Sequence, residues 1–125
     1  MKARTIIITA VVTALVASSF AVKSYLYQRE AMRAVVTVLN SWHDNTQNTT
    51  VEYWQNPKNS APVYNLLSYS VVQSKFFNKN NKRTAHIVVT LEFDSNHVFP
   101  SNKNWLFELI YTRYGWQITE FQKTD

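Results

Sequence analysis

The pattern of apolar and polar positions divides the chain into a helical first part and a strand-rich second part. Residues 5–22 form an uncharged, mostly apolar run between Arg4 and Lys23. From residue 24 to residue 44, apolar positions then recur at the three- and four-residue spacing of one helix face. The members of that face are Ala31, Met32, Val35, Val38, Leu39 and Trp42. The sequence therefore predicts an apolar helix that continues into an amphipathic helix.

A polar stretch, DNTQNTT, ends the helical pattern, and the strand-like part begins after Pro62. Either Thr49 or Thr50 is expected to cap a short helical turn that runs through Trp54. Four runs rich in β-branched and aromatic residues follow, at positions 66–77, 84–94, 104–112 and 116–121. Short polar turns between the runs favour an antiparallel meander, with Gly115 at positive φ in the last hairpin. The expected fold class is α+β: a helix packed on a curved, four-stranded antiparallel sheet.

Alternation assigns the two faces of the predicted sheet. Large apolar residues share the side expected to carry the helix: Ala85, Ile87, Val89, Leu91, Phe93, Trp105, Phe107, Leu109 and Tyr111. The opposite side is mixed, and Val88, Leu106 and Ile110 make it too apolar for a fully solvated face. These three residues are candidates for a partner interface, whereas the simpler interpretation is that half-exposed aliphatic residues are good strand formers.

The N-terminal run predicts a membrane segment. As a helix, residues 5–22 would span about 27 Å, close to the ~30 Å hydrocarbon core of a bilayer. An uncleaved signal anchor is the favoured interpretation; a signal peptide cleaved near Ala21 and a buried helix of a soluble protein are the alternatives. In either leading case residues 24–125 lie outside the cytoplasmic membrane, tethered if the segment is kept and periplasmic or secreted if it is removed. The chain thus comprises a targeting segment, residues 1–23, and one domain, residues 24–125.

Composition excludes several kinds of chemistry. Gly115 is the only glycine in 125 residues, so the chain has neither a P-loop nor a dinucleotide fingerprint. The absence of cysteine excludes disulfides, thiolate metal sites, a cysteine nucleophile and the acylated cysteine of a lipoprotein. The histidines, His43, His86 and His97, lack the spacing that would bring two metal ligands onto one helix face. No metal and no cofactor are predicted.

Few residues are candidates for catalysis. His43 and Asp44 could act as a base and its orienting group, but adjacent helix positions point in different directions, and His43 suits the helix C-terminus as a cation. Tyr111 could donate a hydrogen bond inside a pocket, although a buried tyrosine more often packs its ring. No catalytic residue is assigned, and the chain is expected not to be an enzyme.

A basic cluster lies around the first predicted turn of the sheet. Lys75, Lys79, Lys82 and Arg83 are interleaved with aromatic residues, a composition also found in nucleic-acid-binding proteins. A hairpin tip is normally charged because it is solvated, and a location outside the cytoplasm excludes most nucleic acid. The sequence therefore predicts a solvated turn, with contact to an anionic lipid or protein as the alternative, and no nucleic-acid partner.

The succession of elements is similar to the cystatin-like, nuclear transport factor 2-like superfamily. The similarity rests on a helix ending in Trp42, an aromatic turn around Trp54, and a meander that contains W-x-F-x-L from Trp105 and closes with G-W-x-I from Gly115. The resemblance implies a helix packed into the concave face of the sheet, often with a conical pocket. Members use this pocket for catalysis, for ligand binding or not at all, and some membrane-anchored members assemble secretion machines.

These observations favour a non-enzymatic interaction or assembly domain, with a protein partner or a second copy as its binding partner. The alternative from another class is a binding module for a small apolar ligand; an isomerase-like enzyme is less favoured. In the binding module, aromatic side chains would line the cone between helix and sheet: Trp42, Trp54, Trp105, Tyr111 and Trp116. The competing interpretation places the tryptophans in the hydrophobic core.

Overall fold

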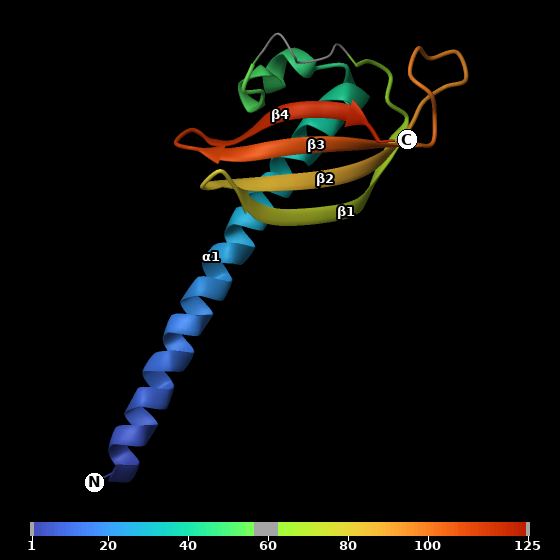
Figure 1. Cartoon of the computed structure of the whole chain (residues 1–125). Helices are drawn as coiled ribbons and strands as arrows, with labels where there is room; N and C mark the ends of the chain where they lie inside the picture. Colours follow the sequence, from blue (N-terminus) through green and yellow to red (C-terminus); the bar gives the residue numbers. More distant parts are fainter. Residues whose placement is uncertain (1, 57–62, 125) are drawn as a thin grey trace. The chain divides into compact units, whose positions relative to one another are not determined.

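The computed structural model describes residues 2–56 and 63–124, with the backbone alone described for residues 2–20 and 47–49. One long helix, a short 3₁₀ helix and four strands follow one another along the chain (Figure 1). Their bounds are α1 Lys2–Asp44, η1 Gln47–Tyr53, β1 Ser68–Lys79, β2 Lys82–Glu92, β3 Lys103–Thr112 and β4 Gly115–Lys123. The chain divides into two compact units, Met1–Glu30 and Ala31–Asp125, and the boundary falls within α1.

The second unit contains the C-terminal part of α1, which is amphipathic as predicted. Its buried side chains recur at helical spacing and include Ala31, Val35, Val38, Leu39 and Trp42. The helix ends at Asp44, where Asn45 takes a left-handed φ of 59° and the backbone N–H of Thr46 donates to the carbonyl of Ser41 at 2.8 Å. This bond satisfies one of the carbonyls that a helix end leaves without a partner.

The predicted membrane segment falls largely outside the described side chains. Residues 2–20 are helical, but their side chains are not described, so the anchor predicted at residues 5–22 stays a prediction. In the part of the chain whose side chains are described, no helix is long and apolar enough to span a membrane.

The sheet is a four-stranded antiparallel meander in the order β1-β2-β3-β4, as the succession of turns predicted (Figure 1). The hairpin between β1 and β2 is tighter than expected, because Asn80 and Asn81 both adopt positive φ and together form the whole turn. In the hairpin between β3 and β4, Gly115 has a φ of 95°, which confirms the role predicted for it.

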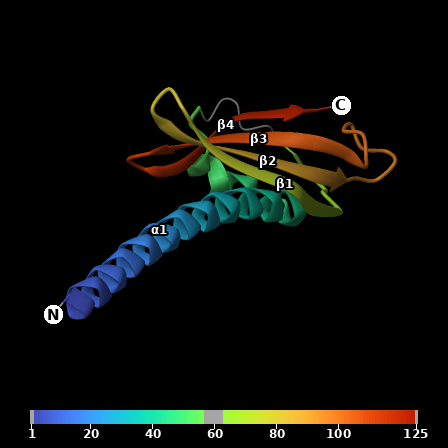
Figure 2. The same ribbon diagram turned by 60° about the horizontal axis from the view of Figure 1, so that its bottom comes forward.

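One face of the sheet is buried against the helix and the other is not. Figure 2 shows the C-terminal part of α1 lying along one face. Ile87, Phe107 and Leu109 on that face are completely buried, and the Trp42 ring from α1 lies 5.7 Å from the Phe107 ring. The predicted α+β class and the predicted assignment of the two faces are therefore confirmed. We call the face opposite the helix the outer face.

The short helix after α1 begins at a different residue from the one predicted. The 3₁₀ helix begins at Gln47 after Thr46, which makes no side-chain capping bond, so Thr49 and Thr50 were wrong as caps. Thr50 is instead buried, and its hydroxyl lies 3.3 Å from the hydroxyl of Ser41 on α1. Just beyond this helix, Trp54 forms a parallel bridge with Ile118 of β4.

Candidate interaction surface

The outer face carries the three aliphatic residues that the sequence singled out as a partner interface. Val88 of β2 and Leu106 of β3 are cross-strand partners, so their side chains are neighbours. Ile110 lies further along β3 and pairs with Thr84 and Gln117. All three are only partly buried. The structure thus brings two of the predicted residues together, and it places a polar cluster between them and the third.

That polar cluster centres on Glu108. Its carboxylate accepts a hydrogen bond from Nε2 of His86 at 2.7 Å and one from the hydroxyl of Thr119 at 3.1 Å. The ammonium group of Lys79 lies 3.9 Å from the same carboxylate. Burial raises the pKa of Glu108, but the hydrogen bonds from His86 and Thr119 and the charges of Lys79 and His86 outweigh it and hold the pKa below its ordinary value. The carboxylate is therefore a partnered anion, in contrast to its exposed cross-strand neighbour Glu120.

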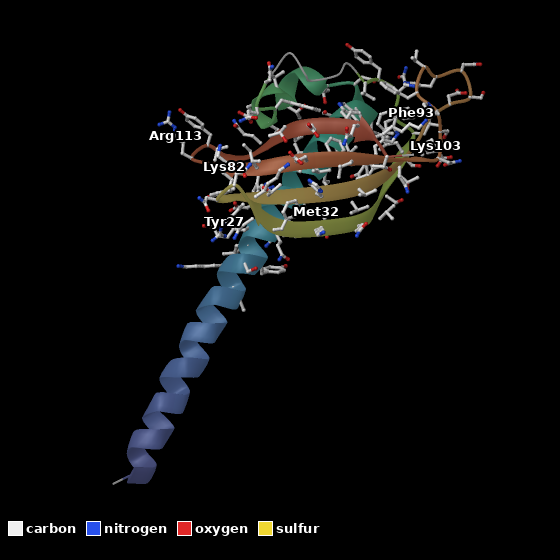
Figure 3. The ribbon with its side chains drawn as sticks, in the orientation of Figure 1. Tyr27, Met32, Lys82, Phe93, Lys103 and Arg113 are labelled. Atoms are coloured by element: carbon white, nitrogen blue, oxygen red, sulfur yellow. The ribbon has the colours of Figure 1, made fainter. Side chains whose placement is uncertain are left out.

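Aromatic and basic side chains extend the outer face towards the hairpin between β1 and β2. The rings of Phe77 and His86 meet edge to face at 4.8 Å, and the ammonium group of Lys75 lies 5.7 Å from the centre of the Phe77 ring. Figure 3 shows Lys82 and Arg113, from the two hairpins, at the same end of the sheet. The basic residues predicted as a solvated turn thus adjoin a folded patch of aromatic and ionic contacts.

The two edges of the sheet differ. The edge of β4 that faces away from β3 is occupied near its middle. There Trp54 bridges to Ile118, and the backbone N–H of Gln55 donates to the Ile118 carbonyl at 3.0 Å. β1 is the other edge strand, and among residues 2–56 and 63–124 only β2 pairs with it. The apolar side chains of Val71 and Val72 on this strand are 39% and 56% exposed. An open edge of this kind is a template for pairing with another strand.

Four of the five aromatic residues predicted to line a ligand cone lie in the core. Trp42, Trp54, Trp105 and Trp116 are all at least nine-tenths buried, and Tyr111 is partly buried. They form separate clusters: Trp42 and Trp105 both contact the Phe121 ring, whereas Tyr111 contacts Trp116 at 5.5 Å. The burial supports the core interpretation of the tryptophans. The indole N–H groups of Trp105 and Trp116 nevertheless have no hydrogen-bond acceptor in the described structure.

The remaining candidates are exposed or dispersed. His43 and Asp44 form a 2.9 Å pair at the end of α1, contrary to the expectation that adjacent side chains diverge, and both are more than half exposed. Over the residues with described side chains, no three histidine or acidic groups come close enough together to hold a metal ion.

Two interactions were not predicted from the sequence. The His86–Glu108 pair depends on the register between β2 and β3, which the alternation within each strand does not determine. His97, in the loop after β2, stacks on Phe93 at 4.2 Å and joins two segments: its Nε2 donates to the Tyr64 carbonyl at 2.7 Å, and its Nδ1 accepts from the Phe99 N–H at 2.9 Å. Its position between two phenylalanines was the only signal for this role in the sequence.

Comparison of the chain with protein families, with curated proteins and with solved structures found no match. What the outer face and the β1 edge do is therefore inferred from their own geometry.

Proposed function

We propose that this chain is a non-enzymatic protein-interaction domain that is tethered to the outer side of a bacterial cytoplasmic membrane and contributes to the assembly of a larger envelope complex. The observation that carries the proposal is the asymmetry of the sheet. The helix covers one face and the Trp54 segment occupies part of one edge, whereas the outer face and the β1 edge have no such cover among the described residues.

The chemistry of the uncovered surface suits a protein partner. Val88 and Leu106 offer apolar area, and the partnered Glu108 lets this area lie beside a charge without exposing an unpaired carboxylate. The aliphatic residues and Phe77 supply apolar and aromatic area of the kind found at the centre of an interface, and the lysines beside them would belong to its polar rim. The similarity to the cystatin-like, nuclear transport factor 2-like superfamily belongs to the same proposal, since membrane-anchored members of it act through protein contacts.

The tether is the uncharged run at residues 5–22, with Lys2 and Arg4 on the inner side. Intact-mass measurement of the native protein tests this part of the proposal. A full-length mass that fractionates with membranes supports the anchor, whereas loss of residues 1–21 overturns it and makes the domain a free periplasmic or secreted protein.

Site-specific photo-crosslinking tests the interaction surface. A photoreactive amino acid in place of Leu106, on the outer face, is expected to give a discrete adduct in cells. The matched control places the same group at Val98, which is 94% exposed in a loop. An adduct at position 106 and none at position 98 supports the proposal, and the adduct mass distinguishes a second copy from another protein. Equal labelling at both positions, or none at position 106, overturns it.

A binding module for a small ligand is a second candidate, favoured by one observation. The buried indole N–H group of Trp116 lacks an acceptor among the described atoms, and a ligand with an acceptor group beside it would satisfy it. Displacement of an environment-sensitive apolar dye, read against tryptophan fluorescence, tests this candidate. Saturable displacement of the dye by a candidate ligand, lost in Trp116→Phe, would favour a binding module. No displacement from the unaltered chain would remove this candidate function.

A further inference from the structure

We propose that the edge of β1 between Gln73 and Lys79 binds an extended, acidic segment of another protein by strand addition. The inference rests on the proposed interaction function and names the class of partner. The segment would carry carboxylates at two positions four residues apart, with an apolar residue midway between them.

The first support is the free edge itself. β1 has 12 residues and, within the described part of the chain, pairs with β2 alone, so alternate backbone N–H and C=O groups along its other side face away from the sheet. No described segment covers these groups, in contrast to β4, where Gln55 donates to Ile118. An extended peptide that lies along such an edge gains main-chain hydrogen bonds, and its side chains then determine specificity.

The second support is the regularity of one part of the strand. The pairing of β1 with β2 shifts register at Val72, between Val71 and Gln73. This bulge bends the strand and divides its edge. From Gln73 to Lys79 the pairing runs without a shift, opposite Val88 to Lys82. These seven residues form the longer straight stretch of the edge, which is long enough for a short added strand.

The third support is the chemistry along that stretch. Lys75, Phe77 and Lys79 occupy alternate positions and share the outer face. The contact of Phe77 with His86 and the approach of Lys79 to Glu108 place both side chains there, and Lys75 lies over the Phe77 ring. Directly opposed residues on paired strands have Cβ atoms about 5 Å apart. An added strand would therefore place one side chain opposite each of the three. The side chains complementary to Lys75, Phe77 and Lys79 are an acidic, an apolar and a second acidic residue.

Charge argues against a second copy as the occupant. Lys75, Lys79, Lys82 and Arg83 surround this edge, and the whole chain has a formal charge of +5. Pairing two copies through β1 would bring these cations together, and lysines on edge strands are a common device against self-pairing. Among the described ion pairs, Glu108 meets only Lys79 of these four residues, so it offsets one cation of the cluster. An acidic strand meets no such repulsion.

The test uses the full chain and a nine-residue peptide with glutamate at its third and seventh positions, valine at its fifth and threonine elsewhere. Its affinity is measured by fluorescence anisotropy at low salt, and the backbone amides of β1 are followed by hydrogen exchange. We expect saturable binding with slower exchange between Gln73 and Lys79.

The double variant Lys75→Glu/Lys79→Glu should weaken binding about tenfold or more, since two opposed charge pairs become repulsive. The matched control Lys103→Glu/Lys123→Glu changes two exposed lysines elsewhere on the sheet and alters the net charge by the same amount. After correction for net charge, its affinity for the peptide should lie within about threefold of that of the unaltered chain.

A second peptide, N-methylated at the alternate residues whose amides would face β1, separates strand addition from simple charge attraction. It keeps every charge but cannot form the ladder, so it should not bind to the unaltered chain. Equal binding of the methylated peptide, equal weakening by the control variant, or no binding at all would overturn the inference. Peptide-independent dimers seen by sedimentation, with protection at β1, would overturn it in favour of a second copy. A discrete photo-adduct at position 106 together with a failed peptide test would remove this inference alone and leave the interaction function standing.

Discussion

Nε2 of His86 lies 2.7 Å from the carboxylate of Glu108, directly across the β2–β3 pair. The bond joins two strands on the outer face and fixes the position of the one carboxylate there that is mostly shielded from water. Together with the bonds from Thr119 and the charge of Lys79, it overcomes the effect of burial and lowers the pKa of Glu108. Folding stability is therefore linked to the ionisation of this group.

The first prediction concerns Glu108→Gln. A carboxyl whose pKa is lowered by folding stabilises the protein above the pKa of the unfolded chain, and this contribution is lost as the pH falls through the folded value. The variant should lose about 1–2 kcal/mol of unfolding free energy at pH 7, where charge-assisted bonds disappear. The difference from the unaltered chain should shrink steadily as the pH falls below 4.5, the ordinary value for the group. Urea unfolding measured across this range checks the expectation.

Glu120→Gln provides the control for that series. Glu120 is the cross-strand partner of Glu108, is exposed and has no side-chain hydrogen bond among the described residues. Its removal should leave the free energy of unfolding at pH 7 unchanged or slightly higher, because it ends a repulsion between like charges. A loss as large as that of Glu108→Gln would show that general surface charge, and not the His86 contact, carries the effect.

The second prediction concerns His97. Because Nε2 donates to Tyr64 and Nδ1 accepts from Phe99, the ring should be the neutral tautomer protonated at Nε2, which nitrogen-15 shifts of the imidazole report directly. His97→Ala removes both bonds and should cost about 1–3 kcal/mol, with faster exchange of the Phe99 amide. Val98→Ala, at the exposed neighbouring position, should change neither quantity. An Nδ1-protonated ring would contradict the assignment.

The third prediction tests the joint between helix and sheet. Trp42 is fully buried and contacts the rings of Phe107 and Phe121. Trp42→Ala should lower the free energy of unfolding by about 3–5 kcal/mol, because the side chains around the removed ring fill the resulting cavity only partly. Tyr114→Ala, in the 72% exposed tip of the last hairpin, should stay within about 0.5 kcal/mol. Thermal or denaturant unfolding separates the two variants, and comparable losses would mean that Trp42 is not a central core residue.

The fourth prediction isolates a backbone effect. At Gly115 an added Cβ would meet no atom within 4 Å, so Gly115→Ala creates no clash. Its φ of 95° nevertheless disfavours any side chain, and the variant should lose about 1–2 kcal/mol. Asn80→Gly, in the other tight hairpin, should be close to neutral because glycine adopts positive φ freely. Unfolding of the two variants under one condition measures the difference, and a neutral Gly115→Ala would contradict the strain.

Much of the fold follows from local sequence patterns. The helix face that includes Trp42 and the buried strand positions such as Phe107 were predictable, because a period of 3.6 or 2 specifies which side chains share a face. The positive φ of Gly115 was predictable for a similar local reason. The bounds of β1 were placed two residues early, at 66–77, because two asparagines at positive φ make a turn that is shorter than the polar run NKNNK suggests.

The outer face could be predicted in composition but not in arrangement. Alternation places His86 and Glu108 on the same face, yet only the register of β2 with β3 makes them partners, and register is set by turns and bulges outside any one strand. The contacts of His97 could not be predicted, because they join Tyr64 and Phe99 through a loop whose sequence has no periodic pattern. Capping chemistry predicted the start of the 3₁₀ helix at Thr49 or Thr50. The helix begins instead at Gln47, after Thr46, and Thr46 makes no side-chain capping bond that could have marked this start.

The partial occupation of β4 by the Trp54 segment has a consequence for assembly as a whole. Continuous fibrils grow only from units that present two joinable sides, so that each newcomer offers a fresh end to the next. With the middle of one side occupied by its own chain, this sheet has a free edge at β1 only, among the described residues, and a strand added there would end the row. Under the proposed strand addition, such a unit would join an assembly once and in a fixed number.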